Sequence, residues 1–188
     1  YMSVSALASA EPGKSDSNVS GESSPLKESL VLNASFETLV NPPAQKENGM
    51  NWVFRSKTIA DSWVYQQNGG YAETCSDNPA DGKSYLRVAP LRCGFPAFIY
   101  QNVKTQKIPV NNYLLTMKIR GNGSVEPFIT VQSKTGVFGK TKFDAKVGEW
   151  TVVTHTIKVD EQGAMCLMFR ITGESLDIDD VSLVPWAN

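Results

Sequence analysis

From Leu30 onward, the chain is a series of short segments in which apolar and polar residues alternate. Turn signals rich in Gly, Asn, Asp and Pro separate these segments, among them NPPAQKENG, DNPADGK and RGNGS. Alternation places successive side chains on opposite faces of a strand, and many short strands at such spacing are typical of a β-sandwich. No long window shows the period of a helix. We therefore predict an all-β fold, built as a two-sheet antiparallel sandwich.

The alternating pattern also predicts where the strands and the core lie. Two segments, 112–120 and 164–172, carry a plain apolar row on one side, which we assign to the core. These rows are Tyr113, Leu115, Met117 and Ile119, and Met165, Leu167, Phe169 and Ile171. The expected strands are 30–36, 51–58, 62–67, 84–89, 97–103, 112–120, 125–133, 140–143, 150–159, 164–172 and 176–184.

Residues 1–29 differ from the rest of the chain, because they are rich in Ser, Ala, Glu, Gly and Pro and contain hardly any large apolar side chain. Such a segment cannot bury enough apolar surface to offset the entropy of ordering. We interpret it as a tail or linker that precedes one sandwich domain at 30–188. Within it, Ala8-Ser9-Ala10 has the small-x-small form of a signal-peptidase site. We expect the protein to be secreted, periplasmic or displayed on a bacterial surface.

The charge of the chain argues against several classes of partner. Lys and Arg are scattered and the net charge is −1, so a broad attraction to nucleic acid or to an anionic membrane is not expected. No run approaches the roughly 18 apolar residues of a membrane-spanning helix. We expect no nucleic-acid binding, no membrane insertion and a monomer.

Alternation turns aromatic residues outward in three segments, SWVYQQ, SYLRVA and VEPFITVQ. In the first of these, the assignment leaves Val64 alone pointing toward the other sheet. A slip of one residue would instead move aromatic side chains into the core. The residues assigned to the exposed side are Trp63, Tyr65, Tyr85, Arg87, Phe128 and Gln132.

Aromatic rings interleaved with Arg, Gln and Thr suit a sugar ligand. Pyranose rings present apolar C–H faces that stack on aromatic rings, and their hydroxyl groups need donors and acceptors such as Arg and Gln. Two loop aromatics near glycine, Tyr71 in NGGYAE and Phe138 in TGVFGK, are either further exposed ligand residues or packed lids. We predict a carbohydrate-binding face made of these side chains.

The last expected strand, SLDIDDVSLV, sets Asp179 and Asp180 side by side, although aspartate is depleted in strands. Glu37 lies in LNASFE, at the start of the globular region. If the first and last strands are neighbours, these three carboxylates could converge. Hard oxygen ligands suit calcium. We therefore predict a structural calcium ion, held by Glu37, Asp179 and Asp180, that fastens the two ends of the domain.

The cysteines and the histidine point to no metal or catalytic chemistry. The three cysteines form no CxxC motif, so a zinc site is not expected. Cys75 and Cys93 flank a turn-rich segment and either form a disulfide or remain buried thiols. His155, the single histidine, lies in the strand-like WTVVTHTIKV, and there is no GxSxG, HExxH or P-loop motif. We predict that the protein is not an enzyme.

Six motifs follow one another between residues 30 and 184: N-x-S-F-E (33–37), D-G-K-S-Y-L-R-V (81–88), Q-N-V (101–103), N-Y-L-L-T-M-K-I-R-G (112–121), G-E-W-T-V-V-T (148–154) and L-D-I-D-D-V-S-L (176–183). In their order and spacing, the chain resembles the carbohydrate-binding modules of families 4, 9 and 22. These modules belong to the galactose-binding-like jelly-roll superfamily.

This resemblance implies a jelly-roll β-sandwich that binds a polysaccharide or oligosaccharide without catalysis. It also implies a structural calcium ion at Glu37 and the D-D-V aspartates, completed by backbone carbonyls near Asn33 and Lys83. Trp52 and Trp150 match tryptophans that usually pack in the sandwich. Because a fold does not by itself imply a function, the alternative is a structural or protein-interaction jelly roll without a sugar site.

Overall fold

The computed structural model describes residues 28–40, 59–60, 62–66, 70–90, 94–103, 111–131, 141–159 and 163–186. Within these ranges all the assigned elements are β-strands. A helix long and apolar enough to cross a membrane is not found there. The strands are β1 (Leu39–Val40), β2 (Ile59–Ala60), β3 (Val64–Gln66), β4 (Tyr71–Cys75), β5 (Tyr85–Ala89), β6 (Ala97–Asn102), β7 (Asn111–Val131), β8 (Phe143–Asp144), β9 (Thr151–Val159) and β10 (Met165–Trp186).

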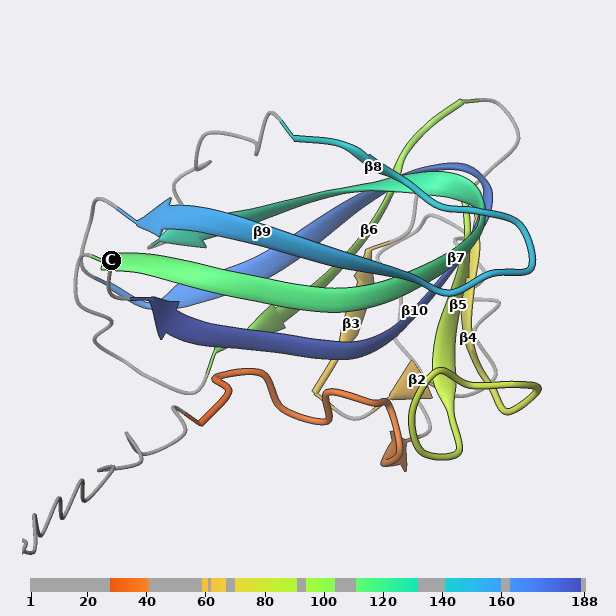
Figure 1. The fold of residues 1–188 in the computed structure, drawn as a ribbon, viewed down its shortest axis with the longest axis horizontal. Coiled ribbons are helices and arrows are strands. Elements are labelled where there is room, and N and C mark those ends of the chain that lie inside the picture. The colour runs from red at the N-terminus through yellow and green to blue at the C-terminus, as the bar shows by residue number, and fades with distance from the viewer. Residues whose placement is uncertain are drawn as a thin grey trace, which may run out of the picture.

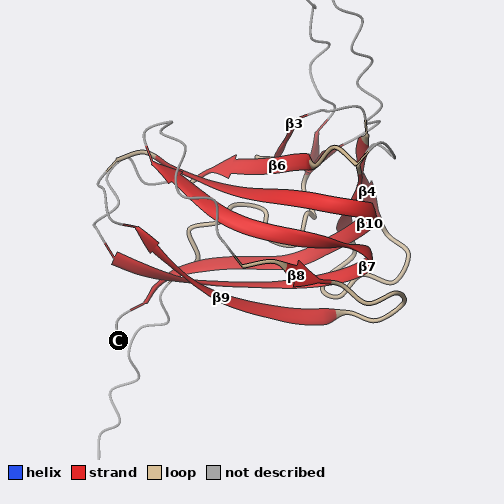
Figure 2. Cartoon of the chain, turned by 90° about the horizontal axis from the view of Figure 1, so that it is seen from above, coloured by secondary structure: helices blue, strands red, loops and turns tan. Residues whose placement is uncertain are grey.

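The two longest strands, β7 and β10, pair antiparallel along almost their whole length and form the spine of the fold (Figure 1). Both bend near their middle, so each strand contributes to two stacked layers (Figure 2). The first layer joins β3, β6, residues 165–172 of β10, residues 124–131 of β7, and β8. The second layer joins β4, β5, residues 176–186 of β10, residues 111–119 of β7, and β9.

One hydrophobic core fills the space between the layers, and both halves of the spine contribute to it. Alternate residues of β10 are buried in the first layer, and the same alternation continues into the second layer with Leu176 and Ile178. The two apolar rows predicted from the sequence, on 112–120 and 164–172, both lie in this core. The predicted all-β sandwich is therefore confirmed.

The bend of the spine depends on glycine. Gly121 and Gly173 have φ angles of 130° and 106°, a region that favours residues without a Cβ. A Cβ at Gly173 would lie 2.5 Å from Cα of Gly123, and a Cβ at Gly121 would lie 2.6 Å from the carbonyl oxygen of Ser175. The sequence pattern predicted a turn at RGNGS; the structure instead continues β7 through Gly121 and Gly123, and β10 likewise continues through Gly173.

We expect Gly173→Ala to lower the free energy of unfolding by about 2–5 kcal/mol, because it adds both a strained φ and a clash with backbone. Gly148→Ala is the matched control. Gly148 also has a positive φ, 76°, but nothing lies within 4 Å of the added Cβ, so about 1 kcal/mol is expected. Urea unfolding of both variants measures the difference. Equal losses would show that the close approach of the two strands is unimportant.

Residues 28–38, expected as a strand at 30–36, form no strand but close one side of the sandwich. The amide of Leu30 donates to the carbonyl of Leu183 in the second layer (2.9 Å). The buried Gln101 side chain of the first layer pairs with the backbone of Leu32, accepting from its N–H at 2.7 Å and donating to its carbonyl at 2.9 Å. The segment thus bridges the layers. The structure also adds β4, which was not predicted, whereas expected strand 51–58 lies outside the described residues.

His155 lies on β9, half-buried, with its ring edge-on to Phe143 at a centroid distance of 5.5 Å. Burial lowers the pKa of His155 below its ordinary value of about 6.5. The unfolded chain therefore binds a proton at this site more readily than the folded protein does between the two pKa values. Stability contributed by the neutral ring is complete above pH 6.5 and is lost as the pH falls toward the lower, folded pKa.

Because His155 is the only histidine, this linkage can be isolated. We expect the free energy of unfolding to fall between pH 7 and the folded pKa in the wild type, and to fall less in His155→Gln. Urea unfolding at half-unit pH steps gives the two curves. Parallel curves for the two proteins would show that His155 does not cause the slope.

Candidate functional site

The prediction that Trp63 and Tyr65 point outward is wrong. In β3, Val64 is the exposed residue (42%), whereas Trp63 and Tyr65 are buried in the core cluster. Trp63 stacks on Phe169 with ring centroids 5.7 Å apart and donates from Nε1 to the carbonyl of Asn33 at 3.3 Å. The assignment slipped by one residue, because the larger apolar area of the aromatic rings favours their burial over that of a single valine. Burial also raises the pKa of Tyr65 to about 12.

Alternation assigned Tyr85 and Phe128 to the correct faces, but neither side chain is exposed. Both lie outside the core cluster, on the outer faces of the two layers, and their exposed fractions are 0% and 2%. Both rings are therefore covered on the outer surfaces of the layers, and they do not lie in the core between the layers. The predicted exposure of these two rings is wrong, and they lie on different layers.

The remaining predicted residues do not assemble into one site. Tyr71 is 37% exposed and begins β4 at the edge of the second layer. Arg87 contacts Tyr85, its Nη2 donating to the hydroxyl at 2.7 Å. Gln132 and Phe138 lie outside the described residues. Among the predicted residues that the structure describes, Tyr85 and Arg87 contact each other.

The outer face of the first layer gathers a different group of side chains. Residues paired across neighbouring strands point to the same face, and one row runs through Val64, Tyr100, Met168 and Phe128. The next row runs through Phe98, Arg170 and Glu126. We call these seven residues the aromatic face. Apart from exposed Val64 and buried Phe128, they are half-buried.

An ion pair anchors the polar side of the aromatic face. Nη1 of Arg170 donates to Oε2 of Glu126 at 2.8 Å, and their side chains are 40% and 17% exposed. The guanidinium carries five N–H donors, so it can donate to a ligand while it remains paired. Half-buried rings beside an oriented guanidinium offer both an apolar surface and directed donors.

Sequence reasoning missed most of this face, although the signal was present. The core row of 164–172 was assigned correctly, so Met168 and Arg170 had to lie on the opposite side. The same counting on AFIYQN gives Phe98 and Tyr100. What the sequence does not show is that β3, β6, β10 and β7 lie next to one another in that order.

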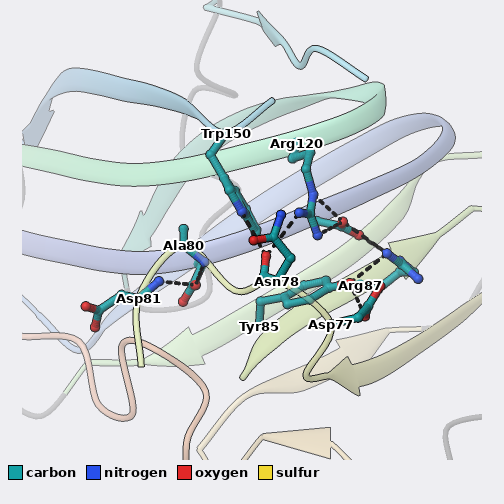
Figure 3. Close-up of polar contacts among 10 residues, drawn as sticks. Asp77, Asn78, Ala80, Asp81, Tyr85, Arg87, Arg120 and Trp150 are labelled. Atoms are coloured by element: carbon teal, nitrogen blue, oxygen red, sulfur yellow. Dashed lines mark hydrogen bonds and ion pairs between the residues drawn. The ribbon is translucent and has the colours of Figure 1, made fainter. Parts of the chain in front are cut away.

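The outer face of the second layer carries a network of charges centred on Asp177. Figure 3 shows the two arginines of this network, Arg87 and Arg120. Asp177 is 4% exposed and lies between Arg87 of β5 and Arg120 of β7. Nε and Nη2 of Arg87 donate to Oδ1 and Oδ2 of Asp177 at 2.8 and 3.1 Å. Nε and Nη2 of Arg120 donate to Oδ2 at 3.0 and 2.8 Å. Asp177 raises the pKa of Arg87, so the Arg87 guanidinium stays charged.

Aromatic rings and the loop 76–84 cover this network (Figure 3). The guanidinium of Arg120 lies over the Trp150 ring at 4.4 Å, and the Trp150 and Tyr85 rings meet edge-on at 5.6 Å. In the loop, the carbonyl of Asn78 accepts from Nη1 of Arg120 (3.0 Å) and from Nε1 of Trp150 (3.1 Å). The Tyr85 hydroxyl donates to Asp77 at 2.7 Å.

The same contacts shift the pKa values of Tyr85 and Asp77, which lie in the cover of the network. Burial and the hydrogen bond to Asp77 raise the pKa of Tyr85, and the bond from Tyr85 lowers the pKa of Asp77. The phenol thus remains a donor and the carboxylate an acceptor. With its charges paired internally, the network fits a structural role better than a ligand site.

We expect Asp177→Asn to lower the free energy of unfolding by about 3–5 kcal/mol, because it leaves two guanidinium groups without their shared anion. Glu149→Gln is the matched control, since Glu149 pairs with Lys146 at 3.7 Å on the surface and should contribute under about 1 kcal/mol. Chemical denaturation reports both values. A loss for Asp177→Asn no larger than that of the control would rule out the central role of this carboxylate.

The three carboxylates predicted to hold calcium do not converge on one site. Within the described ranges, no group of three or more His, Cys, Asp or Glu side chains could hold a metal ion. Oε1 of Glu37 accepts the backbone N–H groups of Lys83 (2.6 Å) and Ser84 (2.9 Å). Asp180 instead lies 3.0 Å from Nζ of Lys118.

Asp179 is fully buried and is held by backbone donors. Its Oδ2 accepts from the N–H groups of Ala80 (2.8 Å) and Asp81 (2.9 Å), and its Oδ1 accepts from Asp180 N–H (2.8 Å). Burial raises the pKa of Asp179, although these three donors oppose the shift. Oε1 of Glu37 and both carboxylate oxygens of Asp179 thus accept from N–H groups, and the carbonyl of Asn33 already accepts from Phe36 N–H and Trp63 Nε1. The residues present therefore do not fit a calcium ion.

Cys75 and Cys166 carry free thiols. Cys75 is half-buried, while Cys93 lies outside the described residues. Burial raises the pKa of both described thiols, which makes them weak nucleophiles.

No protein-family model matches the chain, and no curated protein matches it in sequence. Among solved structures, TmCBM61 in complex with β-1,4-galactotriose is 15% identical with a TM-score of 0.59, covering 85% of this chain and 99% of that chain. A structure described as "CBM4 structure and function" is 16% identical with a TM-score of 0.55, covering 82% and 99%. The CBM22-1 xylan-binding domain from Paenibacillus barcinonensis Xyn10C is 8% identical with a TM-score of 0.52, covering 66% and 85%.

These similarities confirm the fold that the sequence motifs predicted, including the likeness to modules of families 4 and 22. At such low identity they show the fold alone. A cyclase from Fischerella sp. TAU also has this fold, with 14% identity, a TM-score of 0.52 and coverage of 82% of this chain and 94% of that chain. The fold by itself therefore does not decide between binding and catalysis.

Proposed function

We propose that the protein is a non-catalytic carbohydrate-binding module and that the aromatic face is its binding surface. The observation that carries this proposal is the pair of adjacent rows on the first layer, in which rings of Phe98 and Tyr100 lie beside the Arg170–Glu126 pair. Rings supply the apolar surface on which a pyranose stacks, and the ion pair supplies directed polar contacts. The fold shared with carbohydrate-binding modules supports the proposal.

The other outer face is a weaker candidate. Its rings and charges, including Tyr85, Arg120 and Asp177, are buried under loop 76–84 and bond to one another. A sugar would have to displace that loop and break the ion pairs of Asp177. The first layer requires no such rearrangement, since Val64, Tyr100 and Arg170 are already partly accessible.

The charges of the aromatic face favour an uncharged glycan. Arg170 is compensated by Glu126 at 2.8 Å, and the other five residues of the face are uncharged. A uronate would have to compete with Glu126 for the guanidinium and would face its negative charge. Hydroxyl groups of a neutral sugar can instead bond to both partners of the pair. Such capture of a polysaccharide or oligosaccharide agrees with the expected location outside the cytoplasm.

We expect Tyr100→Ala to weaken glycan binding by about 10-fold or more, because a stacked ring contributes on the order of 1 kcal/mol beyond the area it buries. Tyr71→Ala is the matched control, because Tyr71 is an exposed tyrosine of the other layer. Affinity electrophoresis against a panel of soluble polysaccharides identifies a ligand, and calorimetry with its oligosaccharides measures the affinity.

Three outcomes of this experiment would contradict the proposal. Binding that Tyr71→Ala abolishes and Tyr100→Ala leaves intact would move the site away from the aromatic face. Failure of the wild type to bind any member of a broad panel would favour the alternative of a structural or protein-interaction jelly roll. Turnover of an oligosaccharide would replace binding by catalysis.

A further inference from the structure

The loop 76–84 is the place where the two ends of the described domain meet. Glu37, near the first strand, binds the N–H groups of Lys83 and Ser84, and Asp179, in the last strand, binds those of Ala80 and Asp81. Four successive or nearly successive backbone donors of one loop thus face two carboxylates. Successive backbone N–H groups can bind anions, and here the anions are carboxylates of the protein itself.

Lys118 places a full positive charge against a carboxylate and a backbone carbonyl of this arrangement. Its Nζ lies 3.0 Å from Oδ2 of Asp180 and donates to the carbonyl of Ala80 at 3.4 Å. A carboxylate oxygen and a backbone carbonyl are the ligand types that calcium takes. Lys118 reaches them from β7, where it is paired with Asp179 across the spine.

We propose that this chain fastens its two ends without a divalent ion, and that the Lys118 ammonium and the N–H groups of loop 76–84 do the work that the sequence resemblance assigned to calcium. The ammonium and a calcium ion would compete for the same oxygens of Asp180 and Ala80. The buried Asp179 already accepts from three N–H groups, and the exposed Glu37 accepts from two, so neither carboxylate needs a cation to fix its orientation. We call this arrangement of Glu37, Asp179, Asp180, Lys118 and loop 76–84 the clamp. It is independent of the aromatic face and of any sugar.

The first test uses the wild-type chain. Its melting temperature is measured after dialysis against EDTA, and again with added CaCl2 or, as a control for ionic strength, MgCl2. We expect the three melting temperatures to agree within the error of the measurement, and elemental analysis of the purified protein to find calcium far below one ion per chain. A lower melting temperature in EDTA, a rise specific to calcium, or stoichiometric bound calcium would each overturn the proposal.

The second test addresses Lys118 itself. We expect Lys118→Met to lower the melting temperature by about 2–4 °C, the shift that a partly exposed ion pair should cause in a domain of this size, and Lys118→Arg to restore most of the loss. Lys142→Met is the matched control, since Lys142 and Asp144 form a 3.7 Å pair in which both side chains are mostly exposed. A loss no greater than that of Lys142→Met would show that Lys118 does not hold the clamp.

Discussion

The antiparallel pairing of β7 with β10 is the constraint on which the rest of the structure depends. Every other strand of the two layers, apart from β3 and β4 at their edges, is hydrogen-bonded to one of these two strands. Their register sets which side chains become neighbours: it places Asp177 beside Arg120 in one layer and Met168 beside Phe128 in the other. Because the bend at Gly121 and Gly173 turns the ribbon back on itself, one pair of strands builds both faces of the core.

The two outer faces share this origin but differ in what covers them. In the second layer, a carboxylate between two arginines would be costly to bury alone, and the rings of Tyr85 and Trp150 together with loop 76–84 complete its contacts. That face is closed by its own chain. In the first layer, the Arg170–Glu126 ion pair stands among half-buried rings, with polar groups still accessible at Arg170. The sealed face contributes rigidity, which leaves the first layer as the surface suited to a ligand.

The fold could be predicted from the sequence further than the site could. Alternation is a local property, and it gave the strands 84–89, 97–103 and 150–159 and both core rows nearly as observed. It failed at β3, where three residues leave too short a pattern to choose between Val64 and its aromatic neighbours. It also could not predict that a loop would bury Tyr85, or that β6 would bring Tyr100 beside Met168, because both depend on pairings between segments far apart in the chain.

The adjacent carboxylates of Asp179 and Asp180 are stabilised by two different sets of contacts. A register shift between Asp179 and Ser182 inserts one extra residue at this point, and Asp180 adopts a left-handed φ of 49°. The irregularity lets adjacent carboxylates find different partners: Asp179 turns to backbone dipoles under the loop, whereas Asp180, 46% exposed, meets the ammonium of Lys118. Their mutual repulsion is therefore opposed by two separate sets of positive groups. A strand without this bulge would have sent the two side chains to opposite faces, with one of them directed into the apolar core.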